Sequence, residues 1–425
     1  MRPCSMAYVA LVGIGDELCI GQIVNTNAAW LAQRCTELGF RPIRHSVVGD
    51  NVEDIVSELR RLWQQAELVI TTGGLGPTHD DVTTLALATL VESPLHEHPT
   101  VRKWLEEIAQ RRGLVLSERI LRQALLPEGA LPLYNSVGQA PGIWIERNGR
   151  ALLALPGVPA EMQAIVEGSA MELLRAFRQR LGGNVLRFHT IVTAGIAEAP
   201  LADLLGDPST FLPEGVTLAF LPSFWGVRLR LSVTASSLEE ADKRLGEVRQ
   251  HLLQRIAPYV IGEGETSLAH RVGELLRQRG ETLAIAESCT GGLLGTTITD
   301  IAGSSDYFLG GHIVYSNAAK TAFLGVPEEL LQRVGAVSRE VAELLAKNVR
   351  TAFQATYGIG ITGIAGPGGG TPQKPVGTVW IGLATPEYVR ARHFLFGNDR
   401  SANRQRAVAA ALTWLYRTLQ GIPEE

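Results

Sequence analysis

Apolar and polar residues follow two patterns along the first part of the chain. Short apolar runs at residues 8–14 and 68–72 predict buried strands, whereas residues 25–38 and 52–65 have the spacing of amphipathic helices. Strands that alternate with helices in this way predict a parallel α/β sheet with helices on both faces.

A hairpin and a helix follow in the same domain. Asn148-Gly149 separates two apolar-rich runs, which indicates a type I′ hairpin and adds an antiparallel edge to the sheet. A helix is predicted over residues 160–179. The first α/β domain is therefore expected to cover residues 1–180.

The pattern changes near residue 181, and a small α+β module is expected over residues 181–261. Its order is strand, helix, strand, strand, helix, and the strand at 227–233 alternates apolar and polar positions. The compact order could suit a single-strand nucleic-acid binder. Its basic and acidic residues nearly balance, however, so a spacer or dimerisation role fits better.

The remaining residues, 262–425, again show an α/β pattern. A linker rich in glycine and glutamate is expected at 262–265, and a helix then precedes a predicted strand at 282–286. Further predicted elements are strands at 312–315, 358–362, 376–384 and 388–396 and helices at 339–353 and 401–419. The expected architecture is thus two α/β domains joined by a small α+β module.

Composition narrows the class of protein. The 425 residues suggest two or three domains, and a net charge of −4 with 19% charged residues excludes a polybasic nucleic-acid or membrane-surface protein. No apolar run approaches the roughly 20 residues that span a bilayer. The 4 cysteines have no disulfide spacing, which fits a reducing cytoplasm. Met6 is an expected alternative start.

Glycine is abundant, with 45 residues, and we expect the surplus in ligand-binding loops. Gly73-Gly74-Leu75-Gly76 follows a predicted strand and precedes a helix, an arrangement that cradles phosphate. Asp80 and Asp81 would repel phosphate unless a cation such as Mg²⁺ lay between them. A similar glycine–acid segment at 13–17 ends the first strand, where open α/β sheets bind ligands. These loops predict a nucleotide or pterin phosphate site; the alternative is two tight turns with capping aspartates.

A second chemical site centres on Ser288, between a predicted strand and a glycine-started helix. There the N–H groups of residues 289–292 could stabilise an oxyanion. Lys320 is a candidate base because desolvation can lower the pKa of a lysine, and Tyr315 could orient the proton. Cys289 is the rival nucleophile, with a thiolate that a helix start would favour. The alternative is a phosphate-binding turn with Ser288 as a helix cap and Cys289 in the core.

Two further segments point to the same chemistry. Residues 362–370 form a glycine-rich run after a predicted strand, and Arg400 and Arg404 begin the last helix. Arginines there could clamp a phosphate, although they could also form a solvated helix face. Together with a serine–lysine pair, a phosphate anchor implies hydrolysis of an amide on a phosphorylated small molecule.

Segments of the first domain resemble the N-terminal domain of the CinA family, which is similar to molybdopterin-binding proteins. These segments are residues 15–32, 71–83, 134–142 and 155–162. The resemblance implies an ADP-ribose pyrophosphatase that uses a divalent metal, Mg or Co, and is stimulated by K⁺. The implied nucleotide- and phosphate-binding residues are Gly13, Asp16, Glu17, Asn25, Gly73, Gly74, Gly76, Thr78 and Asn135. The implied metal ligands are Asp80 and Asp81.

Residues 286–295, 310–320 and 361–384 resemble the C-terminal domain of CinA, the nicotinamide-nucleotide amidase family. The implied reaction converts nicotinamide mononucleotide and water into nicotinate mononucleotide and ammonia, without a cofactor. Ser288 is then the nucleophile, with Tyr315 and Lys320 as the activating pair. The implied substrate-binding residues are Cys289, Thr290, Gly291, Gly292, Ser305, Asn317, Thr362, Gly363, Arg400 and Arg404. Asn398 is an insertion in the usual Gly-Asp-Arg pattern, so which arginine reaches the phosphate stays open.

The resemblance implies a bifunctional enzyme of pyridine-nucleotide salvage and a homodimer. It also leaves two other functions open. The family is linked to competence and DNA damage, so the chain could mainly bind a partner such as the recombinase RecA. A molybdopterin-binding role rests on fold alone. Neither a membrane nor direct nucleic-acid contact is expected.

Overall fold

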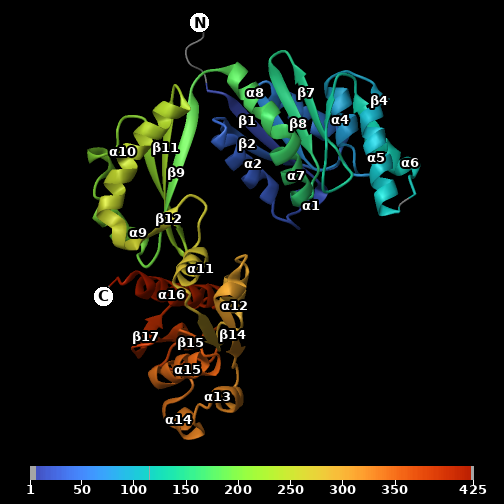
Figure 1. Ribbon diagram of the computed structural model, residues 1–425. Helices are drawn as coiled ribbons and strands as arrows, with labels where there is room; N and C mark the ends of the chain where they lie inside the picture. The colour runs from blue at the N-terminus through green and yellow to red at the C-terminus, as the bar shows by residue number, and fades with distance from the viewer. Residues whose placement is uncertain (1–5, 114, 423–425) are drawn as a thin grey trace. The chain divides into compact units, whose positions relative to one another are not determined.

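The computed structural model describes residues 6–113 and 115–422. The predicted alternative start at Met6 concerns residues 1–5, which lie outside the described residues. The chain divides into two compact units (Figure 1). The N-terminal unit comprises the chain up to Phe188 with residues 214–216 and 232–246, and the C-terminal unit comprises the rest. No helix in the described ranges is both long and apolar enough to cross a membrane.

The N-terminal unit is built on a sheet of strand order β2-β1-β3-β8-β7-β6. The pairs among β2, β1, β3 and β8 are parallel and the remaining pairs are antiparallel, as the alternation of strands and helices predicted. The strands are β1 (Tyr8–Ile14), β2 (Arg41–Val48), β3 (Leu68–Thr72), β6 (Leu131–Leu133), β7 (Gly142–Arg147) and β8 (Arg150–Leu155). Asn148 and Gly149 both have positive φ, which confirms the hairpin, but β6 rather than the hairpin forms the edge.

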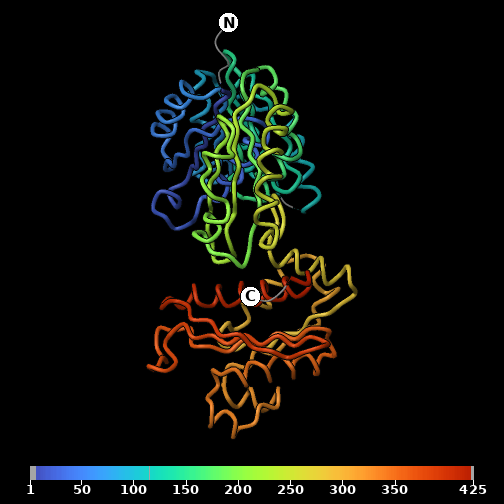
Figure 2. The backbone as a smooth tube through the Cα atoms, turned by 90° about the vertical axis from the view of Figure 1, so that its left-hand side faces the viewer, coloured from blue at the N-terminus to red at the C-terminus, as the bar shows by residue number. Residues whose placement is uncertain are grey.

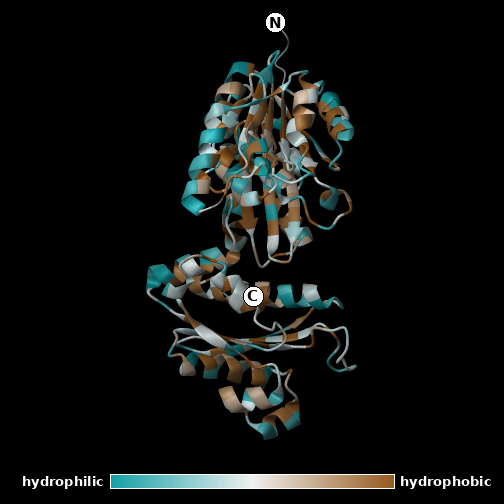
Figure 3. Cartoon of the chain, turned by 90° about the vertical axis from the view of Figure 1, so that its right-hand side faces the viewer, coloured by the Kyte–Doolittle hydropathy of each residue, from teal (hydrophilic) through white to brown (hydrophobic). Residues whose placement is uncertain are grey.

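Helices cover both faces of this sheet. One apolar core joins the sheet to α2 (Thr26–Glu37), α7 (Pro159–Ile165) and α8 (Met171–Leu181). A second core joins the other face to α3 (Val52–Trp63), α4 (Thr83–Leu90) and α5 (Pro99–Arg112). Figure 3 shows apolar strands at the centre of this unit and polar residues on the outer faces of its helices. Smaller elements are α1 (Asp16–Cys19), α6 (Glu118–Leu121), β4 (Leu95–Glu97) and β5 (Leu125–Pro127).

The middle module forms a separate sheet of order β10-β11-β9-β12. Its elements are β9 (Val185–Thr193), α9 (Glu198–Leu205), β10 (Val216–Ser223), β11 (Gly226–Ala235), α10 (Leu238–Ile256) and β12 (Val260–Glu263). The prediction of a linker at 262–265 is wrong for its first half, because Gly262 and Glu263 pair with β9. Glu263 also forms ion pairs with His189 and Arg249.

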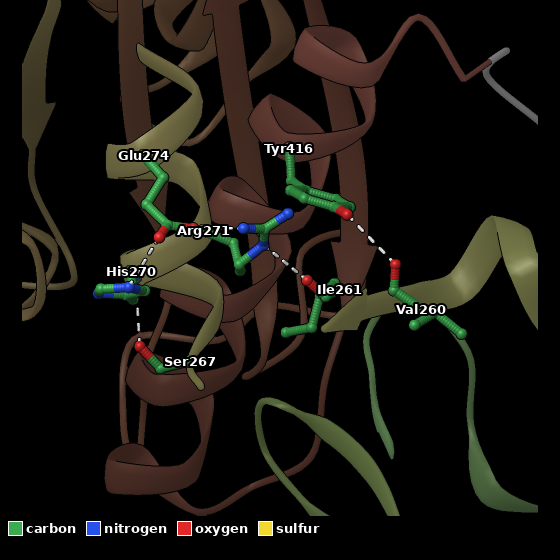
Figure 4. A network of polar contacts seen from close by, with 7 residues as sticks. All are labelled: Val260, Ile261, Ser267, His270, Arg271, Glu274 and Tyr416. Atoms are coloured by element: carbon green, nitrogen blue, oxygen red, sulfur yellow. Dashed lines mark hydrogen bonds and ion pairs between the residues drawn. The ribbon is translucent and has the colours of Figure 1, made fainter. Parts of the chain in front are cut away.

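Strand β12 is bonded to the C-terminal domain through two side chains (Figure 4). Arg271 Nε, on α11 (Leu268–Arg279), donates to the Ile261 carbonyl at 2.9 Å. The Tyr416 hydroxyl, on α16 (Arg400–Gln420), donates to the Val260 carbonyl at 3.2 Å. Both acceptors are main-chain groups.

The C-terminal domain contains a sheet of order β14-β13-β15-β16-β17. Its strands are β13 (Leu283–Glu287), β14 (Phe308–Ile313), β15 (Tyr357–Gly363), β16 (Thr378–Ala384) and β17 (Val389–Leu395). The first three strands of the sheet order are parallel and the last two are antiparallel. Strand β14 begins four residues before the predicted strand. The prediction missed this start because Gly310 and Gly311 weaken the strand pattern, whereas in the structure Gly311 lets the strand pack directly against the Ile285 carbonyl.

Helices again occupy both faces of this sheet, as Figure 2 shows with α16 in red on one side and orange helices on the other. One core includes residues of α11, α12 (Leu293–Thr299) and α16. The other includes residues of α13 (Asn317–Leu324), α14 (Glu328–Val334) and α15 (Arg339–Ala352).

Part of the glycine surplus lies in strands rather than in ligand-binding loops. A Cβ at Gly360 would lie 2.6 Å from the Ala346 nitrogen, and one at Gly382 would collide with the Ala342 carbonyl. These glycines therefore allow α15 to pack directly on β15 and β16. The expectation that the surplus serves ligand-binding loops is correct only in part.

Candidate active sites

The N-terminal unit has a pocket of about 800 Å³ at the carboxyl ends of its parallel strands. Segments that follow β1, β3 and β8 form its wall. The predicted residues that line it are Glu17, Asn25, Gly73, Gly74, Gly76, Asp80 and Asp81. Four other predicted residues, Gly13, Asp16, Thr78 and Asn135, lie outside its lining.

The glycine loop after β3 is held tightly in place. Gly73 has φ 111°, and a Cβ there would overlap the Ile14 carbonyl, so only glycine fits. The Asp81 carboxylate accepts hydrogen bonds from Gly76 N at 2.7 Å, Thr78 N at 2.7 Å and Thr78 Oγ1 at 2.6 Å. Asp81 therefore organises the loop, and its role as a metal ligand stays a prediction. Asp80 is exposed and pairs with His79 at 2.8 Å.

Gly13 and Asn135 support the pocket from behind. A Cβ at Gly13 would lie 2.5 Å from Asn25 Nδ2, so the glycine makes room for the residue that caps α2. Asn135 is buried and donates to Glu161 at 2.6 Å and to the Ala140 carbonyl at 2.9 Å. Its Oδ1 accepts from the N–H groups of residues 137 and 138, so it shapes a loop of the lining.

The pocket also contains residues that the sequence did not predict. Asn27 Oδ1 and Gln123 Oε1 are buried acceptors without a hydrogen-bond partner in the described part of the chain. Arg112 brings a positive charge to the lining, and Asp50 and Glu161 bring negative charges. The sequence offered a signal for Asn27, because it lies two residues after Asn25 within residues 15–32, one of the segments that carry the family resemblance. The sequence offered no such signal for Arg112 and Gln123, because both follow α4 in the chain and reach the pocket only through the tertiary fold.

Acidic residues gather at one side of the pocket. Burial raises the pKa of Asp50, a hydrogen bond from the Asp16 backbone N–H lowers it, and the charges of Asp16, Glu17 and Asp80 raise it further. Among the residues that the structure describes, no three His, Cys, Asp or Glu side chains are close enough to hold a metal by themselves. These carboxylates fit Mg²⁺, which protein sites commonly bind through one or two carboxylates, substrate phosphates and water.

The second site lies in the C-terminal domain and contains Ser288 and Lys320, which the structure brings together. Ser288 Oγ lies 3.1 Å from Lys320 Nζ, and the two residues are 7% and 1% exposed. Lys320 Nζ also donates to the carbonyls of Val314 at 2.8 Å and Tyr315 at 3.2 Å. A neutral amine has two N–H bonds and one lone pair. In the neutral form, an amine that donates both N–H groups to these carbonyls would present its lone pair to the serine hydroxyl.

Local structure explains this arrangement. Ser288 directly follows β13, and its N–H donates to the Ile361 carbonyl on β15. Ser316 caps α13 by accepting from Ala319 N, which places Lys320 in the first turn, beside the end of β14. Burial lowers the pKa of Lys320 below its ordinary value, which favours the neutral amine.

A buried carboxylate occupies the start of α12. Glu287 is 1% exposed and accepts hydrogen bonds from the N–H groups of Gly292, Leu294 and Gly295. The N–H of Gly291 donates to the Ser288 carbonyl. The expectation that all of residues 289–292 could serve an oxyanion is therefore wrong for Gly291 and Gly292. Cys289 and Thr290 keep N–H groups without a hydrogen bond to another residue in the described structure.

Cys289 is a poor nucleophile in this environment. Burial, together with the nearby Glu287 charge, raises the pKa of its thiol to about 12. The expectation that the helix start favours a thiolate is wrong, because Glu287 already occupies that helix start. The other free cysteines of the described chain are Cys19 and Cys35.

The two arginines have different positions. Arg404 donates twice to the Thr290 carbonyl, at 2.7 and 3.1 Å, and so holds the loop after Ser288. Arg400 donates to the Gly366 carbonyl at 2.7 Å and to the Tyr315 hydroxyl at 3.0 Å. Tyr315 is 59% exposed and meets Lys320 only through its carbonyl in the hydrogen bonds of the described chain. Its predicted activating role therefore has no hydroxyl–amine hydrogen bond to support it.

The remaining predicted residues of the C-terminal site make no side-chain hydrogen bond to Ser288 or Lys320 within the described residues. Thr362 donates to the Ala336 carbonyl at 2.8 Å, and a Cβ at Gly363 would lie 3.0 Å from Cys289 Sγ. Ser305 and Asn317 are exposed, and no side-chain hydrogen bond within the described residues joins them to Ser288 or Lys320.

The fold and the two sites define an α/β protein with a glycine-lined pocket in one domain and a buried serine–lysine pair in another. Family models match residues 10–176 as a probable molybdopterin binding domain, 189–262 as a damage-inducible protein CinA KH domain and 265–419 as a CinA C-terminal domain. The chain is 46% identical over 410 residues to a CinA-like protein of Salinibacter ruber, covering 96% of this chain and 98% of the relative. The chain belongs to the CinA family.

Other relatives are similar. A CinA-like protein of Gemmatimonas aurantiaca is 43% identical over 411 residues, covering 96% of each chain. A solved structure of the competence/damage inducible protein CihA from Agrobacterium tumefaciens is 38% identical, covers 36% of this chain and 93% of its own, and has a TM-score of 0.35.

The middle module matches a KH-domain model, and this match bears on the earlier alternative that the module binds single-stranded nucleic acid. KH domains clamp nucleic-acid backbones with a Gly-x-x-Gly loop. Residues 189–262 contain no Gly-x-x-Gly sequence. The match thus describes the type of module, while the sequence lacks the element with which such modules hold a strand.

Proposed function

We propose that the C-terminal domain hydrolyses the carboxamide of nicotinamide mononucleotide to nicotinate mononucleotide and ammonia. The observation that carries this proposal is the buried contact of 3.1 Å between Ser288 Oγ and Lys320 Nζ. Two carbonyls take the N–H groups of the amine, and the pKa of Lys320 is lowered, so a general base faces the nucleophile.

The chemistry follows from these positions. Ser288 Oγ attacks the carboxamide carbon while Lys320 takes the hydroxyl proton. The N–H groups of Cys289 and Thr290 stabilise the resulting oxyanion. Lys320 then protonates the leaving nitrogen, and ammonia departs from an acyl-serine. Water attacks this ester, with Lys320 again as base, and releases nicotinate mononucleotide and free Ser288.

Arg400 is the proposed phosphate anchor. Its guanidinium meets the exposed Tyr315 hydroxyl at 3.0 Å, so both side chains can reach a bound phosphate. Arg404 instead supports the Thr290 carbonyl with two hydrogen bonds, which fits a positioning role. We therefore assign the phosphate to Arg400 rather than to Arg404 in this proposal.

The amidase is tested with the purified full-length protein. We expect ammonia and nicotinate mononucleotide to appear in equal amounts from nicotinamide mononucleotide, measured by a coupled ammonia assay and by chromatography. Nicotinamide riboside lacks the phosphate and should react far more slowly. Absence of ammonia release from the mononucleotide would reject the proposal.

We propose that the N-terminal unit hydrolyses the pyrophosphate of ADP-ribose with a divalent cation. The support is the pocket at the strand ends, with Arg112 for phosphate and Glu17, Asp50 and Asp80 for the cation. The cation would neutralise phosphate charge when bound. Asn27 Oδ1 and Gln123 Oε1 are unpaired neutral oxygens that could accept a ribose hydroxyl or ligate K⁺.

Asp81 and Asp80 give a matched pair of variants for this site. The two carboxylate oxygens of Asp81 together accept three hydrogen bonds, and Asp81→Asn replaces one of these oxygens with an amide group that cannot accept, so the loop should lose its shape. We expect ADP-ribose turnover to fall at least about tenfold and not to recover at high metal concentration. Asp80→Asn should instead raise the metal concentration required. Wild-type turnover by Asp81→Asn would contradict the role of the loop.

Homodimerisation, cytoplasmic location and capture of RecA stay predictions of the family resemblance. RecA binding predicts stable capture in a pull-down even when Ser288 and Asp81 are both replaced. A molybdopterin-binding role predicts that molybdopterin competes with ADP-ribose for the N-terminal pocket.

A further inference from the structure

The C-terminal unit has a pocket whose lining includes neither Ser288 nor Lys320. Its volume is about 560 Å³, within the range of small-molecule sites. The turn between β10 and β11 and the start of α9 form one wall. Strand β17 and the middle of α16 form the other wall.

The charge of this pocket is strongly asymmetric. Arg392, Arg406 and Arg417 contribute to the lining, whereas Glu198 is its single acidic residue. Within the described residues, Arg406 has no carboxylate at ion-pair distance. Arginine guanidinium groups suit phosphate because they donate in a planar fork. The charge therefore favours an anionic ligand.

The pocket also offers aromatic surfaces. The rings of Phe394 and Phe396 are stacked with centroids 5.7 Å apart, and Phe224 lies under the Arg406 guanidinium at 5.4 Å. Phe224 is 42% exposed, although it is a large apolar side chain. Aromatic side chains beside arginines bind planar bases by stacking.

We propose that this pocket binds a free nucleoside monophosphate, with its phosphate on Arg406 and its base against the phenylalanine rings. The volume of the pocket and its two walls favour a small molecule over a strand of nucleic acid. The proposal does not depend on the amidase, since none of its residues belongs to the serine–lysine site.

Binding is measured by calorimetry on the full-length protein with three probes, adenosine 5′-monophosphate, adenosine and inorganic phosphate. We expect the monophosphate to bind more tightly than either fragment. Arg406→Ala should weaken this binding at least about tenfold, because a charge-assisted bond to phosphate is lost, and Arg406→Lys should weaken it less. Phe394→Ala should also weaken it.

Two controls separate this pocket from the other sites. Arg390→Ala removes a positive charge from the same strand as Arg392 but outside the pocket, so binding should be unchanged. Arg406→Ala should keep wild-type turnover of nicotinamide mononucleotide and ADP-ribose, if the wild type has these activities, and a wild-type thermal melt.

Several results would overturn the proposal. They are an absence of binding by the wild type, equal affinity for adenosine and its monophosphate, or an isotherm that neither Arg406→Ala nor Phe394→Ala changes. Tighter binding of a single-stranded oligonucleotide than of the monophosphate, lost in Arg406→Ala, would assign the surface to nucleic acid instead.

Discussion

Replacing Ser288 with alanine should reduce ammonia release from nicotinamide mononucleotide by roughly 10⁴-fold or more, the scale seen when a serine nucleophile is removed. Ser288 Oγ faces the amine of Lys320 at 3.1 Å, and alanine leaves that base without a nucleophile. Initial rates under saturating substrate measure the loss. Binding of the substrate should survive, because Arg400 and Tyr315 are unchanged.

Cys289→Ala is the matched control for this experiment. Its thiol is buried, and its pKa of about 12 leaves almost no thiolate near neutral pH. We expect the rate of this variant to stay within a few-fold of wild type. If Cys289→Ala were inactive while Ser288→Ala kept its rate, the nucleophile would be the cysteine.

Lys320→Met should cost about 10²–10⁴-fold in kcat, the usual scale for loss of a general base. Methionine has a similar length but no basic amine. In the wild type, the neutral amine is the active form, so kcat/KM should rise as pH increases through the pKa of Lys320. Because burial lowers that pKa, the rise should occur below the pH at which an exposed lysine loses its proton.

A pH profile of both proteins decides whether Lys320 is the base. The rising limb should disappear in Lys320→Met together with the rate. Lys347→Met removes an exposed lysine of α15 and should keep both the rate and the profile. A rising limb that persists in Lys320→Met would assign the proton transfer to another group.

Local sequence was sufficient where the chemistry depends on neighbours in the chain. Ser288 follows a strand and Lys320 stands one turn into a helix, and parallel pairing of β13 with β14 brings the two segments together. The role of Glu287 was not predictable in this way. In the sequence, a glutamate at a strand end cannot be distinguished from a solvated carboxylate. Only the fold shows that the N–H groups at the start of α12 donate to Glu287.

The pocket of the N-terminal unit shows the same limit. Its glycine loop could be recognised because the residues are contiguous, whereas Arg112 and Gln123 reach it through tertiary packing. The linker prediction at 262–265 failed for a related reason. Glycine and glutamate are poor strand formers, but pairing with β9 and ion pairs to Glu263 outweigh that propensity.

Strand β12 has a consequence for chimeric proteins. Its main chain completes the middle sheet, while Arg271 and Tyr416 bond to its carbonyls at Ile261 and Val260. Carbonyl oxygens are present whatever the side chain, so this joint depends on the length of β12 more than on its sequence. C-terminal domains from relatives that retain the arginine and the tyrosine should therefore be exchangeable at this joint, provided that no residue is inserted or deleted in β12.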